Sequence, residues 1–128
     1  GMRQRVSSGT HWEDRVGYSR AVRAGNEVHV SGTTATDDDG NVVAPGDPYE
    51  QTKHAIGLVT EALEAASASR SDVVRTRLFV VDVDDWEAVG RAHEEAFGEI
   101  RPATTMVEVS RLIDDDLVVE VEAVAICE

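Results

Sequence analysis

Two glutamates are the first candidates for chemistry, because they interrupt an otherwise apolar segment. Glu120 and Glu122 lie two positions apart within residues 117–127, so in a strand both side chains would share one face. A buried carboxylate costs several kcal/mol unless it is paired or protonated. One interpretation is a general acid or base, or a group that orients water, in an interface cleft. The alternative, which the pattern alone favours, is a salt bridge to Arg75 or Arg77 on a neighbouring strand.

Three further side chains carry weaker signals. Ser31 precedes Gly32 at the end of an expected strand, but no base is spaced with it as in a catalytic triad. Cys127 has no helix N-terminus or neighbouring base to activate it, so an inert thiol is expected. Arg101 stands at the entrance of a strand and could bind a substrate carboxylate or simply remain solvated.

The sequence predicts no metal site. The four histidines, none of them at ligand spacing, are His11, His29, His54 and His93. His93 falls on the apolar stripe of an expected helix, where a core histidine is commoner than a catalyst. The aspartate run 37–39 ends at Gly40, the fourth position, whereas a calcium loop needs its glycine at the sixth. We therefore interpret this run as a solvated turn.

Charge and length restrict the class of protein. Twelve Lys and Arg against 25 Asp and Glu give a net charge of −13, which opposes binding to nucleic acid and to anionic membranes. One cysteine allows no intrachain disulfide, and no apolar run could span a membrane. No signal peptide is recognisable, and Gly1 is interpreted as a tag remnant. We expect one cytoplasmic domain over residues 1–128.

The segments that should position these residues include several strands. Strands are expected over 3–8, 19–24, 27–31, 73–82, 103–110 and 117–127. Gly25 and Asn26 suit a two-residue hairpin turn. The last strand is apolar on both of its faces apart from the two glutamates, which predicts burial on both sides. Such burial implies an oligomer.

Two helices are expected between these strands. Asp47 and Asp84 are predicted as N-caps, each with a glutamate three residues later, as in a capping box. Pro48 suits the first position of a helix over 48–67, and Gly98 is the expected end of the second helix. The order β-β-β-α-β-α-β-β predicts an α+β fold, with a mixed sheet and two helices on one face.

At this point the sequence resembles a known family. Four segments carry the resemblance: Gly17-Tyr18 before the hairpin, the strand residues 78–82, and the C-terminal blocks 102–109 and 119–125. They are similar to segments of the RidA/YjgF family, the reactive intermediate deaminases also labelled L-PSP endoribonucleases. The resemblance implies a chorismate-mutase-like fold and a homotrimer, with a central barrel and three clefts between subunits. It also implies hydrolysis of an imine or enamine to a 2-oxo acid and ammonia, without a metal or organic cofactor.

The resemblance also implies roles for particular residues. Glu120 would position water, while Tyr18, Ser31 and Gly32 would line the cleft. The family's carboxylate-binding arginine falls at Thr104, so the chain resembles an arginine-lacking branch. A threonine cannot replace a bidentate charged pair, which is worth about 2–5 kcal/mol when broken. We therefore expect hydrolysis of 2-iminoacids to be inefficient.

These considerations lead to one function hypothesis and one alternative. The hypothesis is a trimeric hydrolase or deaminase-like enzyme for a small imine, enamine or related metabolite. Glu120 would act on water, and Thr104, Thr105 and Arg101 would complete substrate binding. The alternative is a non-catalytic, metabolite-binding or regulatory trimer. Ribonuclease activity is disfavoured by the charge of −13.

Overall fold

The computed structural model describes residues 3–128, so the predicted tag remnant Gly1 lies outside the described residues. The strands are β1 (Gln4–Val6), β2 (Ala21–Ala24), β3 (Glu27–Thr34), β4 (Val73–Val80), β5 (Ala103–Glu108) and β6 (Val119–Ile126). The helices are α1 (His11–Val16), α2 (Pro48–Ala65) and α3 (Trp86–Phe97), with 3-10 turns η1 (Arg70–Asp72) and η2 (Val83–Asp85).

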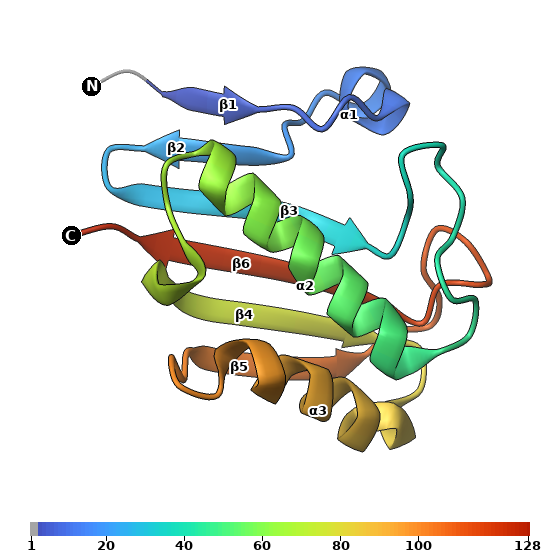
Figure 1. Ribbon diagram of the computed structural model, residues 1–128. Coiled ribbons are helices and arrows are strands. Elements are labelled where there is room, and N and C mark those ends of the chain that lie inside the picture. The colour runs from blue at the N-terminus through green and yellow to red at the C-terminus, as the bar shows by residue number, and fades with distance from the viewer. Residues whose placement is uncertain (1–2) are drawn as a thin grey trace.

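The six strands form one mixed sheet in the order β1-β2-β3-β6-β4-β5. Neighbouring strands are antiparallel except β4 and β5, which are parallel. Helices α2 and α3 lie side by side across one face of the sheet (Figure 1). The predicted α+β architecture is therefore confirmed, and β5 is a free edge strand.

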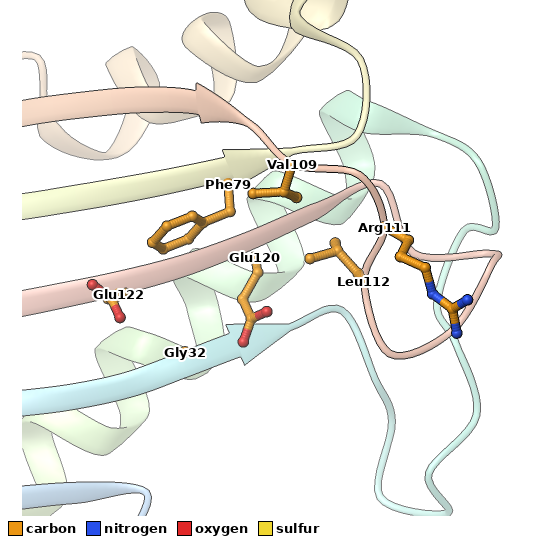
Figure 2. A pocket seen from close by; sticks show the side chains of 7 residues that line it. All are labelled: Gly32, Phe79, Val109, Arg111, Leu112, Glu120 and Glu122. Atoms are coloured by element: carbon orange, nitrogen blue, oxygen red, sulfur yellow. The ribbon is translucent and has the colours of Figure 1, made fainter.

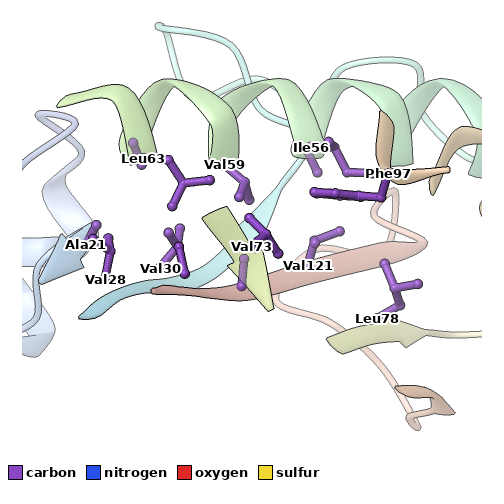
Figure 3. Close-up of a cluster of buried hydrophobic side chains, with 14 of the residues drawn as sticks. Ala21, Val28, Val30, Ile56, Val59, Leu63, Val73, Leu78, Phe97 and Val121 are labelled. Atoms are coloured by element: carbon purple, nitrogen blue, oxygen red, sulfur yellow. The ribbon is translucent and has the colours of Figure 1, made fainter. Parts of the chain in front are cut away.

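The core fills the space between this helix pair and the sheet. Apolar side chains of α2 and α3, among them Ile56, Leu63 and Phe97, pack towards the sheet residues Val28 and Val121 (Figure 3). On β6 the residues at alternate positions from Val119 are buried in this core. Among the residues that the structure describes, no helix covers the opposite face of the sheet (Figure 1). We refer to it as the open face.

The first long helix begins as its capping residues predict. Asp47 accepts a hydrogen bond from the backbone N–H of Glu50 at 3.0 Å, and Pro48 is the first helical residue. The helix ends at Ala65, two residues before the predicted end. Ser67 adopts a left-handed φ of 61°, and the N–H of Ala68 turns back to the carbonyl of Leu63 at 2.9 Å.

The prediction of Asp84 as the cap of the second helix was wrong. Asp82 instead accepts from the N–H of Asp84 at 2.9 Å and starts the turn η2, so α3 begins only at Trp86. Gly98 does follow the helix, but with a right-handed φ of −57°. The left-handed residue is Arg101, whose N–H bonds to the carbonyl of Phe97.

The short helix α1 was not predicted. Thr10 and Glu13 have the spacing of a capping box, and Glu13 is buried while accepting hydrogen bonds from Ser8 and Thr10. Sequence reasoning also ended β3 at residue 31, whereas it continues to Thr34 through an irregularity in register between Val30 and Thr33. Within residues 3–128, no helix is long and apolar enough to cross a membrane.

Candidate functional site

Glu120 lies on β6 with its side chain on the open face, half-buried. Its neighbours across the sheet are Thr34 on β3 and Phe79 on β4. The carboxylate sits above Gly32, where an added Cβ would lie 2.2 Å from Oε2 of Glu120 (Figure 2). A glycine at position 32 is therefore what admits the carboxylate at this place.

A shallow pocket with a volume of about 260 Å³ opens beside this carboxylate. Its lining combines apolar side chains with both signs of charge (Figure 2). The lining residues are Gly32, Phe79, Val109, Arg111, Leu112, Glu120 and Glu122. We call it the Glu120 pocket. This lining suits a small molecule that carries both polar and apolar groups.

The two glutamates differ in their partners. Glu122 Oε1 lies 3.1 Å from Nη1 of Arg77, so the salt-bridge alternative is correct for Glu122. Within residues 3–128 no side-chain hydrogen bond or ion pair is formed by Glu120. Loss of solvent contact raises the pKa of Glu120 above its ordinary value, a shift that Arg20 opposes and Glu122 reinforces. A half-buried, unpaired carboxyl with a raised pKa is suited to proton transfer.

Arg20 organises the side of the site that faces β2. Its Nη2 donates to the carbonyl of Gly32 at 2.7 Å, and its guanidinium lies 5.6 Å from the ring centre of Tyr18. The hydroxyl of Ser31 donates to the backbone carbonyl of Ser19 at 2.6 Å. The structure thus brings Tyr18, Ser31 and Gly32 into one neighbourhood around Glu120 and Arg20.

Thr104 and Arg101 do not join this neighbourhood within one chain. Thr104 on β5 pairs with Thr76 of β4, and its hydroxyl lies 2.7 Å from that of Thr76 on the helix-covered face. Arg101 is exposed in the turn before β5. Ala103 pairs with Arg75, whereas Glu120 pairs with Phe79, four residues further along β4. Arg101 precedes Ala103, so it lies beyond the end of the sheet that is far from the pocket.

Thr105 occupies an intermediate position. It pairs with Arg77 on the open face, two strands away from Glu120, and its hydroxyl accepts from Nη2 of Arg75 at 2.7 Å. In this hydrogen bond the hydroxyl only accepts, so its own proton can still be donated. Of the predicted binding residues, Thr104, Thr105 and Arg101 therefore need another copy of the chain if they are to meet the Glu120 pocket.

Sequence reasoning missed several residues of the site. The sequence did offer a signal for Arg20, because it is a positively charged residue directly before Ala21, the first residue of β2. Arg111 and Leu112 lie between β5 and β6, and nothing in their spacing shows that the chain folds back onto Glu120. Among residues 3–128 no group of three or more His, Cys, Asp or Glu side chains is placed to hold a metal ion.

Comparison with known proteins identifies relatives along nearly the whole chain. The family model described as "Endoribonuclease L-PSP" matches residues 10–127. An uncharacterised protein of Streptomyces coelicolor, SCO2049, is 45% identical over 122 residues, covering 95% of this chain and 90% of that protein. The 3-aminoacrylate deaminase RutC of Acinetobacter baylyi is 35% identical over 108 residues, covering 84% of this chain and 85% of RutC.

The solved structures give the same result for the fold. Rv2704 from Mycobacterium tuberculosis, a member of the YjgF/YER057c/UK114 family, superposes with a TM-score of 0.89 at 48% sequence identity. That alignment covers 98% of this chain and 99% of Rv2704. Together with the family model and the curated relatives, it shows that this chain belongs to the RidA/YjgF family, the family also described as endoribonuclease L-PSP.

Proposed function

We propose that the protein is a RidA-like hydrolase of the deaminase type, acting on a small imine, enamine or related metabolite. The observation that carries this proposal is the carboxyl of Glu120, which is half-buried, unpaired within the described chain and seated against Gly32. The name of the Acinetobacter relative supports an enamine substrate, since 3-aminoacrylate is an enamine that bears a carboxylate.

Hydrolysis of an imine requires water and two proton transfers, and an enamine must first gain a proton on its β-carbon, with loss of one from nitrogen, to become the imine. Water then adds to the carbon of the C=N bond, and one of its protons passes to the nitrogen to give a carbinolamine. Collapse of the carbinolamine forms the C=O bond, and ammonia leaves. Glu120 orients the attacking water and takes or returns its proton, a role that its raised pKa supports. No redox step occurs, so the residues of the pocket need no added electron carrier.

We propose that the working unit is a homotrimer, with the site between neighbouring chains. The free strand β5 and the exposed apolar side chains Val74, Val107 and Ile126 leave surface for another copy. A neighbour at this edge would place its own Thr104 near the Glu120 pocket, which one chain cannot do. Native mass spectrometry tests the assembly, with a mass of three chains expected and a monomer contradicting it.

Arg111 is the proposed cation for an anionic substrate. It lines the Glu120 pocket, is exposed, and makes no ion pair or side-chain hydrogen bond within residues 3–128. It can therefore replace the charge that an arginine at position 104 would supply. Arg111→Gln should raise KM for 3-aminoacrylate more than for an uncharged imine. An equal change for both substrates would show that Arg111 does not select the carboxylate.

The main test is turnover of imines released by an amino-acid oxidase and of 3-aminoacrylate. Glu120→Gln keeps the size of the side chain but removes the titrating proton, and should slow turnover by about 10²- to 10⁴-fold. Glu122→Gln is the matched control, because Glu122 lies on the same face but is paired with Arg77. Equal rates for wild type and Glu120→Gln would contradict the proposal.

A wild-type protein without turnover would favour the alternative of a non-catalytic, metabolite-binding trimer. The observation behind this alternative is the hydrogen bond between the hydroxyls of Thr104 and Thr76. A binding protein should show a higher melting temperature with 3-aminoacrylate analogues such as acrylate, without product formation.

A further inference from the structure

A second polar cluster lies on the helix-covered face of the sheet, away from the Glu120 pocket. It joins α3, β4 and β5 through the side chains of His93, Thr76 and Thr104. The Thr76 hydroxyl lies 2.8 Å from His93 Nε2 and 2.7 Å from the Thr104 hydroxyl. The direct approach of His93 Nε2 to Thr104 Oγ1 is longer, at 3.5 Å. We call this set the Thr–His cluster.

The cluster connects the protein interior with its surface. Thr76 is fully buried, His93 is partly buried against the ring of Phe97, and Thr104 is exposed on the edge strand β5. Burial lowers the pKa of His93, which keeps the imidazole neutral at pH 7. A neutral imidazole has one nitrogen free to accept a proton.

The hydroxyl groups give this connection a direction. A threonine hydroxyl donates one hydrogen bond and can accept others. With Nε2 of His93 as acceptor, Thr76 donates to His93 and Thr104 donates to Thr76. Thr104 Oγ1 keeps a lone pair, and the residue is exposed, so this lone pair is available to an outside molecule. Within the described chain, Thr104 Oγ1 also lies 3.3 Å from the carbonyl of Pro102 and 3.5 Å from His93 Nε2.

We propose that Thr104, Thr76 and His93 form a proton relay that ends at the surface of β5 and serves the neighbouring chain's Glu120 pocket as a second acid–base unit. This proposal rests on the proposed function. In the relay, water gives a proton to Thr104 Oγ1, Thr104 passes its own proton to Thr76, and Thr76 passes its own to His93 Nε2. Two O–H bonds and one N–H bond form as three O–H bonds break, and the reverse transfer restores the cluster.

Thr104 would contact the substrate or its water, whereas Thr76 and His93 act through it. Thr104→Val removes the hydroxyl at an exposed site, and should lower kcat about 100-fold. Thr104→Ser should restore the wild-type rate. Thr76→Val should give the same loss, and the double variant no further loss, because each substitution breaks the same relay. Thr60→Val is the matched control, since within residues 3–128 the Thr60 hydroxyl bonds to the carbonyl of Ile56 on α2 and to the guanidinium of Arg70.

Unchanged turnover in Thr104→Val, or losses that multiply in the double variant, would overturn the relay. Failure of the proposed function looks different, because wild type would then show no turnover of any imine or of 3-aminoacrylate. A second readout covers that case. In a protein NMR experiment, the hydroxyl proton of Thr76, which is donated to His93 Nε2, should exchange with water quickly in wild type and Thr104→Ser, and slowly in Thr104→Val. Equal exchange rates in all three proteins would contradict the relay whatever the substrate.

Discussion

The two polar regions of this molecule lie on opposite faces of one sheet and are built in opposite ways. The Glu120 pocket on the open face holds a carboxyl without a partner among residues 3–128, next to a glycine that leaves room for it. The Thr–His cluster on the covered face satisfies its buried groups internally, at 2.7 and 2.8 Å. An unsatisfied group is suited to act on a ligand, while a satisfied chain is suited to conduct a proton.

The difference follows from what covers each face. Helices α2 and α3 exclude water from one side of the sheet, so Thr76 must find partners within the protein. No helix of residues 3–128 covers the other side, and Glu120 keeps part of its contact with solvent. Stability should therefore depend mainly on the covered face, and activity on residues of the open face together with the exposed end of the Thr–His cluster.

The largest expected effect is on the covered face. Phe97→Ala empties a fully buried position between α3 and the sheet and should lower the free energy of unfolding by about 3–5 kcal/mol. Trp86→Ala on the same helix is the control. Trp86 is 58% exposed, so its loss should cost less than about 1 kcal/mol. Urea denaturation measures both, and similar losses would contradict the division between faces.

A substitution on the open face should separate activity from stability. Gly32→Ala places a methyl group where Oε2 of Glu120 lies, and the flexible glutamate must swing aside. We expect a loss of turnover of about 100-fold, with a change in unfolding free energy below about 1 kcal/mol. A variant that unfolds readily but turns over normally would reverse this expectation.

Polar interactions on the two faces should also differ in energy. Thr76→Val leaves His93 and Thr104 without their buried partner and should cost about 1–2 kcal/mol of stability. Arg77→Gln breaks the ion pair between Arg77 and Glu122. Because these two side chains are 54% and 35% exposed, the free energy of unfolding should fall by less than about 1 kcal/mol. The opposite ranking in thermal or urea unfolding would show that the cluster adds no stability.

The smallest expected effect is a dependence of stability on pH. Burial raises the pKa of Glu120 above 4.5 in the folded protein, so ionisation of Glu120 begins to oppose folding as the pH rises above 4.5 and does so fully above the raised pKa. Glu120→Gln should therefore be more stable than wild type at pH 7. The difference should shrink as the pH falls through the pKa of Glu120 towards 4.5. A difference that grows towards acid pH would contradict the assigned environment.

Much of the fold could be predicted because local signals agreed with it. Asp47 and Pro48 start α2 as expected, and alternation on the last strand placed Glu120 away from the core. The start of α3 was missed because Asp82, Asp84 and Asp85 compete as caps, and only the turn η2 decides between them. Local patterns do not resolve such competition.

The site was less predictable, because it depends on pairing between distant segments. Spacing could not show that Thr104 and Glu120 face opposite sides of the sheet, since this depends on the register of β4 with both β5 and β6. Nor could it show that His93 reaches Thr76, seventeen positions earlier in the chain. The residues resembling the family pointed to Glu120, but Arg111 and the Thr–His cluster required the structure.

The central claim is that Glu120 of one chain and Thr104 of its neighbour serve the same site, and subunit mixing tests it most directly. Glu120→Gln and Thr104→Val are each expected to lose turnover in pure form. If the two are unfolded, mixed in equal amounts and refolded together, about one quarter of the sites in random trimers should regain both native side chains. The account predicts recovery of about one quarter of the wild-type rate. A mixture no more active than its two components would contradict it.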